Sequence, residues 1–167
     1  MVEAKTDLMI EAKGLAKTFY VGFFRRKAEA LRGLDLEVRR NEVLGFLGPN
    51  GAGKTTTIKV LLGIIHPTAG SATIMGRPLG DTEVKDKIGF LPEQPYFYDY
   101  LTGAEFLDFY GRFHRLGKDA RRQRTRELLE LVGIPDAADV PLRKYSKGML
   151  QRVGMAQALL GDPDLVI

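Results

Sequence analysis

The sequence predicts an α/β fold in which a core of strands and helices passes into a helical region. Three observations support this prediction. An apolar run at residues 42–47 has the length of a buried strand, and a glycine-rich loop at residues 48–53 follows it. Residues 56–62 then have the pattern of a helix. From residue 102 to about residue 160 the pattern turns helical, interrupted by glycine and proline breakers.

Shorter patterns predict the remaining strands. We expect strands at residues 8–13 and 31–38, and further strands at residues 71–75 and 87–91. The loop at residues 21–27, between the first two strands, carries two aromatic side chains beside three cations. This composition fits either a packed hairpin loop or contact with a membrane surface or a partner.

The glycine-rich loop carries the most specific chemical signal. Residues 48–55 match the phosphate-binding pattern G-x-x-x-x-G-K-[ST] at every fixed position. Glycines let backbone N–H groups approach a polyphosphate, and the N-terminus of the next helix attracts anions. Lys54 is predicted to reach the β- and γ-phosphates, and the Thr55 hydroxyl to coordinate Mg²⁺. The predicted nucleotide contacts here are Gly48, Pro49, Asn50, Gly51, Ala52, Gly53, Lys54, Thr55 and Thr56.

Two later segments narrow the class of protein. The phosphate loop alone is shared by GTPases, kinases, helicases and transport ATPases. Here Leu91-Pro92-Glu93-Gln94 follows it, and Tyr145-Ser146-Lys147-Gly148-Met149 opens a later helix that continues with Gln151-Arg152-Val153. Together the three segments resemble the ABC-type ATPase family, which has a glutamine loop and an L-S-G-G-Q signature in this order. The resemblance covers essentially the whole chain.

The resemblance implies a role for each matching residue. Gln94 matches the glutamine that senses Mg²⁺ and the attacking water, so it joins Lys54 as a catalytic candidate and Thr55 as a metal candidate. Ser146 and Gly148 match signature residues that contact the γ-phosphate held by the opposite subunit, which implies a head-to-tail dimer. Ser146 is also a good N-cap for the helix that follows.

Two further features refine the resemblance. Tyr145, Lys147 and Met149 depart from the usual signature, and the resulting form resembles bacterial exporters whose ATPase is a separate polypeptide. An aromatic residue before the second strand often stacks on adenine in this family, and Phe19 is the best positional candidate, followed by Tyr20. Stacking alone leaves guanine possible, so ATP is implied by the family and not by base recognition.

The resemblance implies an α/β, RecA-like P-loop NTPase core with an N-terminal antiparallel β subdomain and a helical subdomain. We expect the core at residues 1–94, the helical subdomain at residues 95–145, and the signature helix and the start of a further strand at residues 146–167. In the family that strand ends in a Mg²⁺-binding aspartate, followed by the catalytic glutamate and later by a switch histidine. These have no counterparts in the 167 residues, so we expect the C-terminal part of the core to be missing and the chain to bind ATP without hydrolysing it.

Composition and the absence of certain sequence patterns restrict where in the cell the protein is expected. No apolar stretch reaches the roughly 18–20 residues that span a bilayer, no signal-peptide pattern is present, and the chain has no cysteine. We therefore expect a cytoplasmic protein, peripheral on the inner face of the cell membrane through its permease. The net charge of +4 is uneven, because residues 112–126 hold seven basic side chains and one acid. Their helical periodicity favours a solvated basic face over a nucleic-acid or lipid-headgroup surface.

The combined prediction is the ATP-binding subunit of a membrane exporter, with ATP and Mg²⁺ as cofactors. Its expected partners are a second ATPase subunit and transmembrane permease subunits, and no nucleic acid is expected. The aromatic segment at residues 95–100 either receives a helix of the permease or forms a core beneath the helical subdomain. The alternative function is a soluble ABC-type ATPase acting on ribosomes or nucleic acid, for which the basic run would be the contact.

Overall fold

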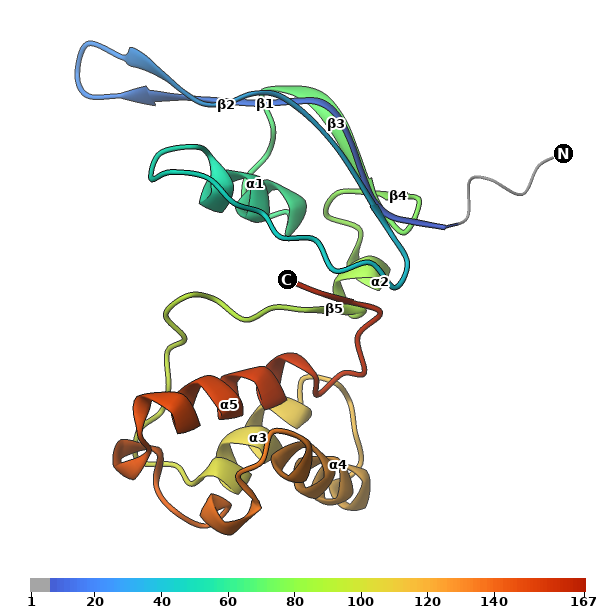
Figure 1. The fold of residues 1–167 in the computed structure, drawn as a ribbon, viewed down its shortest axis with the longest axis vertical. Coiled ribbons are helices and arrows are strands. Elements are labelled where there is room, and N and C mark those ends of the chain that lie inside the picture. The colour runs from blue at the N-terminus through green and yellow to red at the C-terminus, as the bar shows by residue number, and fades with distance from the viewer. Residues whose placement is uncertain (1–6) are drawn as a thin grey trace, which may run out of the picture. The chain divides into compact units, whose positions relative to one another are not determined.

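The computed structural model describes residues 7–167, which divide into two compact units between Lys85 and Asp86. The first unit is mainly a β-sheet with one long hairpin, and the second is mainly helical (Figure 1). Each unit buries its own set of apolar side chains. A mixed α/β fold with an antiparallel N-terminal sheet and a helical part is therefore confirmed.

The sheet of the first unit has four antiparallel strands in the order β2-β1-β3-β4. The strands are β1 (Leu8–Val21), β2 (Arg26–Arg39), β3 (Ala69–Ile74) and β4 (Arg77–Pro78). The predicted strands at 8–13, 31–38 and 71–75 lie at these places, but β1 and β2 are each 14 residues long and continue well beyond the prediction. The loop between them is a turn of four residues, 22–25.

β1 continues past residue 13 because Gly14 forms an irregularity within the strand and does not end it. Gly14 has a φ of +55°, and its N–H donates to Asp35 Oδ1 at 2.7 Å. The strand register shifts between Ala12 and Leu15 at this point, and both side chains are buried. An extra residue in one strand is a β-bulge, which bends a strand without terminating it.

Two helices complete the first unit. α1 (Lys54–Leu61) follows the glycine-rich loop and buries Val60 and Leu61, and the short α2 (Thr82–Lys85) buries Val84. The predicted helix at 56–62 is confirmed, and it begins at Lys54. The predicted strand at 42–47 is wrong: this segment has no regular structure, and Val43 and Leu47 are 99% and 92% exposed. No strand within residues 7–167 pairs with it, and a strand of consecutive apolar residues needs neighbours and cover on both faces.

The second unit packs three helices around one core. Its helices are α3 (Gly103–Gly111), α4 (Lys118–Leu131) and α5 (Lys147–Ala158), with short 3₁₀ turns η1 (Pro135–Ala137) and η2 (Leu142–Lys144) between the last two. Thr102 and Glu105 form the predicted capping box at the start of α3. The buried side chains are Phe106, Leu107, Leu128, Leu129, Ile134, Ala137, Leu142, Tyr145, Val153, Ala156 and Leu160.

A short parallel strand pair closes the second unit. β5 (Ile88–Gly89) pairs with β6 (Leu165–Val166), and the ladder extends to a hydrogen bond of 2.9 Å from Leu91 N to Ile167 O. The predicted strand at 87–91 and the predicted start of a strand after residue 162 are thus neighbours. Parallel strands need a crossover connection. The segment with α3, α4 and α5 provides it between β5 and β6.

Candidate nucleotide-binding site

The phosphate loop takes backbone conformations that favour glycine. Gly51 and Gly53 have φ values of +84° and +88°, in the left-handed region that other residues rarely adopt. At Gly53 a Cβ would also lie 2.4 Å from the carbonyl oxygen of Ala30. The loop is therefore seated on β2 at a point where no side chain fits.

The N-terminus of α1 is suited to binding an anion. Gly53 caps the helix without a side-chain hydrogen bond, and its first turn has no acidic residue. The backbone N–H groups of the first turn and the positive end of the helix dipole consequently act on the space before the helix. Thr57 is buried, and its hydroxyl donates to Gly53 O at 3.0 Å, which fixes the glycine against the helix.

Lys54 folds back over the loop that precedes it. Its Nζ donates to Gly48 O at 2.6 Å and to Pro49 O at 2.9 Å. An ammonium has three donor hydrogens, so these two bonds orient the charge and leave one donor for a phosphate oxygen. Thr55 lies next to it on the exposed first turn, where its hydroxyl supplies the kind of oxygen ligand that Mg²⁺ prefers. These residues fit a Mg²⁺-bound polyphosphate.

Phe19 lies on the face of the sheet that carries the loop. Lys17 Nζ is 5.2 Å from the Phe19 ring centroid, and the same Nζ donates at 2.6 Å to the carbonyl of His66, just beyond α1. Leu31, the partner of Lys17 across the hairpin, contacts the position where a Cβ of Gly53 would lie. Tyr20 is the next residue of the strand, so it points to the opposite face. This geometry favours Phe19 over Tyr20, and the stacking role stays a prediction.

Gln94 and the signature residues belong to the second unit. Gln94 is exposed in the irregular segment after β5. The segment around it and α5 line a groove of about 670 Å³ whose walls include Pro92, Glu93, Gly148 and Gln151. The glutamine loop and the signature helix therefore share one surface of this unit, whereas the phosphate loop lies in the first unit.

The signature segment caps α5 as predicted. Ser146 is the N-cap, and its Oγ accepts from Met149 N at 3.3 Å. Gly148 is exposed, and a Cβ there would meet only Ser146 Oγ at 4.0 Å. The helix N-terminus is thus open on this side, with no acidic residue in its first turn. An open N-terminus with a hydroxyl beside it suits a phosphate.

Tyr145 has a structural role that the sequence did not indicate. Its ring is buried, and its Oη donates to Ala137 O at 2.5 Å, which ties the signature segment to η1. Burial raises the pKa of this phenol.

Two other residues of structural importance were not predicted from the sequence, Thr57 beneath the phosphate loop and Ala30 behind it. No local pattern marks either one, because both act through residues that lie elsewhere in the chain.

The aromatic segment at 95–100 divides between core and surface. Phe97 packs on Phe106 with ring centroids 5.4 Å apart, and Tyr98 lies 5.5 Å from Phe109. Tyr96 and Tyr100 are exposed. Each of the two interpretations, a core beneath the helices and a surface for a partner, thus has residues that fit it.

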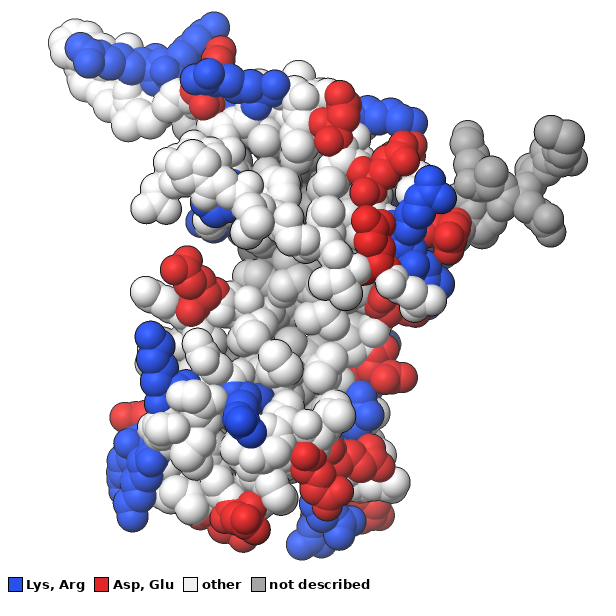
Figure 2. Space-filling view, viewed as in Figure 1, with Lys and Arg blue, Asp and Glu red and all other residues white. Residues whose placement is uncertain are grey.

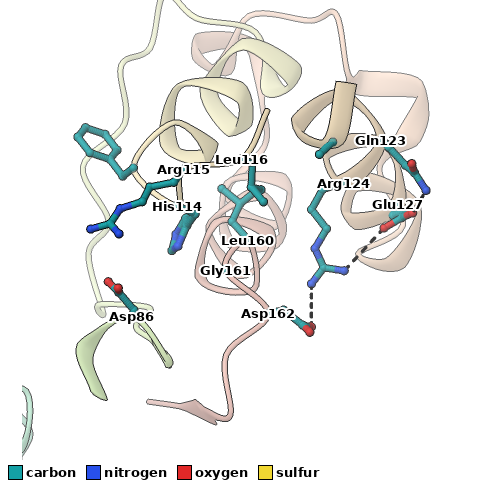
Figure 3. Close-up of a pocket in the computed structure, with 12 residues that line it drawn as sticks. Asp86, His114, Arg115, Leu116, Gln123, Arg124, Glu127, Leu160, Gly161 and Asp162 are labelled. Carbon is teal, nitrogen blue, oxygen red and sulfur yellow. Dashed lines mark hydrogen bonds and ion pairs between the residues drawn. The ribbon is translucent and has the colours of Figure 1, made fainter. Parts of the chain in front are cut away.

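The basic run at 112–126 is partly internal. Figure 3 shows Arg124 reaching from α4 toward Asp162, with Nη2 at 3.2 Å from Oδ1, beside a pocket of about 480 Å³. Arg121 Nε donates to Asp108 Oδ1 at 2.8 Å, and this bond, more than the one from Arg112, lowers the pKa of Asp108. The prediction of a solvated face is correct for the exposed Arg122 and incomplete for Arg121 and Arg124. Because Arg121 and Arg124 bond to Asp108 and Asp162, fewer cations of this run are available to bind nucleic acid.

The two histidines lie in different units. His66 is exposed, and its backbone carbonyl accepts from Lys17. His114 is half-buried in the wall of the pocket in Figure 3, against Gly161.

Across residues 7–167, no helix is both long and apolar enough to cross a bilayer.

Comparison with known proteins identifies the family. The family model described as ABC transporter matches residues 31–167. An ABC transporter ATP-binding protein of Synechocystis is 47% identical over 161 residues, which are 95% of this chain and 46% of that protein. The SkfA peptide export ATP-binding protein SkfE of Bacillus subtilis is 35% identical over 159 residues, covering 95% of this chain and 64% of SkfE.

Solved structures agree with this result. The dimeric structure of MJ0796, a bacterial ABC transporter cassette, aligns with a TM-score of 0.83 at 27% identity, covering 95% of this chain and 72% of that one. A second dimeric structure of the same cassette, bound to ADP and Pi, has a TM-score of 0.82. The chain spans about half the length of the first curated relatives that it matches. Because the family model covers most of the sequence, the chain belongs to the ABC transporter family and carries its ATP-binding domain.

Proposed function

We propose that the full-length protein is the ATP-binding subunit of an ABC exporter, peripheral on the inner face of the cell membrane. It binds ATP with Mg²⁺ and couples hydrolysis, in a head-to-tail dimer, to transport through separate permease subunits. The observation that carries the proposal is the phosphate loop, in which Gly53 is seated against Ala30 and Lys54 is held over the loop. Export is supported by SkfE, a relative named for peptide export.

The loop residues hold the nucleotide. Backbone N–H groups of residues 51–56 bind the β- and γ-phosphates, and the Lys54 ammonium places its remaining donor on them. Thr55 orients the metal, and Phe19 stacks on the base from the same face of the sheet. Bound Mg²⁺ neutralises charge on the phosphates of ATP. Gln94 positions the water that attacks.

The dimer completes each site through the signature helix. Ser146 and Gly148 are exposed at the open N-terminus of α5, so they are accessible to a phosphate held by a second subunit. The dimeric structures of MJ0796 support pairing of two such subunits. We place the permease contact beside the glutamine loop, where the exposed Tyr96 follows the groove of about 670 Å³.

Nucleotide affinity tests the core of the proposal. Titration of the protein with a fluorescent ATP analogue should show Mg²⁺-dependent binding, and Lys54→Ala should weaken it about tenfold or more because a charge-assisted bond to phosphate is lost. Lys59→Ala is the matched control, since Lys59 is the exposed lysine in the last turn of the same helix. Equal affinities for the two variants would refute the role of Lys54.

Turnover tests the finer claims. We expect steady-state ATP hydrolysis from the full-length protein and none above background from residues 1–167 alone. Ser146→Asn keeps an N-cap of equal quality, so it should leave the stability of α5 unchanged while lowering turnover of the full-length dimer. Hydrolysis by residues 1–167 that depends on Lys54 would contradict the first expectation, and full turnover of the Ser146 variant would contradict the second.

A further inference from the structure

Two aromatic side chains are exposed to solvent at the far end of the β1–β2 hairpin. The turn at 22–25 closes with a hydrogen bond of 3.0 Å from Arg25 N to Gly22 O, and Phe23 and Phe24 occupy its two central positions. Their side chains are 96% and 85% exposed. The rings contact each other edge-to-face with centroids 5.7 Å apart, so the turn holds them together as one apolar tip. Of the two interpretations of this loop, the packed hairpin loop is therefore wrong.

This tip projects from the sheet. Pairing of β1 with β3 ends at Ala16, so residues 17–21 and 26–31 form a ribbon of two strands. Lys17 and Thr18 still bond to His66 and Thr68. At about 3.3 Å per residue, residues 19–21 extend the ribbon by about 10 Å beyond these contacts. The end of the ribbon is exposed on both strands from Phe19 to Glu29.

Positive charge lies directly behind the aromatic tip. Residues 14–28 contain four cations, Lys17, Arg25, Arg26 and Lys27, and no acid. Figure 2 shows Lys and Arg side chains gathered over the far end of the hairpin. The next acid, Glu29, forms an ion pair of 3.5 Å with Arg32, which lies further from the tip. No acidic group among the described residues forms an ion pair with Arg26 or Lys27.

The order of groups along the hairpin matches the depth profile of a membrane surface. Phe23 and Phe24 are outermost, and Arg26 and Lys27 follow as the first two residues of β2. Val21 lies opposite Arg26, and Tyr20 lies opposite Lys27, so each cation has an apolar neighbour on its own face. Aromatic rings at the boundary of the acyl chains, with cations at the level of anionic headgroups, are the arrangement of interfacial membrane anchors.

We propose that the tip of the β1–β2 hairpin inserts into the surface of an anionic lipid bilayer. A single-stranded nucleic acid fits less well, because it stacks its bases along a groove or platform, whereas these two rings form a convex tip. The proposal goes beyond the function proposed above and does not depend on it, since no nucleotide-binding residue takes part.

Tryptophan fluorescence tests the insertion directly, because the chain contains no tryptophan. Phe24→Trp in the full-length protein should show a blue-shifted emission and quenching by brominated lipid with vesicles of equimolar phosphatidylcholine and phosphatidylglycerol. Phe113→Trp is the matched control, an aromatic that is 69% exposed in the second unit, and its emission should not change. An unshifted, unquenched emission from the Phe24→Trp variant would overturn the proposal.

Vesicle co-sedimentation tests the two parts of the tip. Serine at both Phe23 and Phe24 should weaken binding to anionic vesicles at least about tenfold. Glutamine at Arg25, Arg26 and Lys27 should weaken it about fivefold for each cation removed. Both variants should retain wild-type nucleotide affinity and circular dichroism, which shows that they fold and separates this test from that of the ATPase. Unchanged vesicle binding by either variant, or binding to RNA in place of vesicles, would overturn the proposal.

Discussion

Alanine substitutions at Gly53 and Gly51 separate two reasons why the phosphate loop uses glycine. Both residues have a positive φ, +88° and +84°. At Gly53 a Cβ would lie 2.4 Å from Ala30 O, whereas at Gly51 no atom lies within 4 Å of the Cβ position. Gly51→Ala therefore introduces backbone strain alone, and Gly53→Ala introduces the same strain together with a steric overlap.

The expected magnitudes follow from this difference. A left-handed conformation costs a residue with a Cβ about 1–2 kcal/mol, offset by about 0.5 kcal/mol because alanine restricts the unfolded chain. We therefore expect Gly51→Ala to lower the free energy of unfolding by about 1 kcal/mol. Relieving the overlap at Gly53 requires β2 and the loop to separate, and overpacking of this kind adds about 1–3 kcal/mol. Gly53→Ala should therefore cost about 3 kcal/mol.

Urea unfolding gives the total loss of stability, and hydrogen exchange of the α1 amides reports on the first unit alone. Titration with an ATP analogue should show the same order, since moving the loop away from Ala30 also displaces the donors of the α1 N-terminus. Equal losses of stability for the two variants would refute the reasoning. The close approach of Gly53 to β2 would then make no measurable difference to the free energy of unfolding.

Three other predictions concern the second unit. Tyr145→Phe should lower the free energy of unfolding by about 1 kcal/mol in urea, because the buried carbonyl of Ala137 loses one of its two donors and keeps only Val140 N; an unchanged midpoint would contradict this. Thr102→Ala should cost about 1 kcal/mol in the same assay, since the capping box is lost, and Thr102→Ser should not. The lowered pKa of Asp108, due first to its bond from Arg121, stabilises the fold above the unfolded pKa of about 3.9. This stability is lost as the pH falls through the folded pKa, so Asp108→Asn should flatten the decline of the melting temperature in acid, and an unchanged decline would count against the ion pair.

The features predicted most accurately depend on local chemistry. The capping box at Thr102 and the N-cap at Ser146 each involve residues three apart in the sequence, so the pattern contains both partners. In the phosphate loop Lys54 also has local partners, carbonyls five and six residues earlier, and its contact with phosphate stays a prediction. Sequence reasoning succeeds at the two caps because the groups that bond to each other are close together in the sequence.

Features that depend on distant partners were not predicted. Gly14 reads as the end of a strand, but Asp35 accepts its N–H from 21 residues away and lets β1 continue. Arg124 reads as one cation of a solvated helix face, but Asp162 lies 38 residues further on. In both cases the residue type permits two structures, and only a partner elsewhere in the chain decides between them.

The apolar run at 42–47 shows the same dependence at the level of the sheet. Consecutive apolar residues specify a strand with both faces covered, and this is a requirement on the surroundings of the strand. Within residues 7–167, β1 to β4 form an antiparallel sheet among themselves, and β5 pairs only with β6. No described strand offers these residues a partner, so Val43 and Leu47 stay exposed despite their composition. A residue pattern thus states what burial a segment needs, and neighbouring strands determine whether it is met.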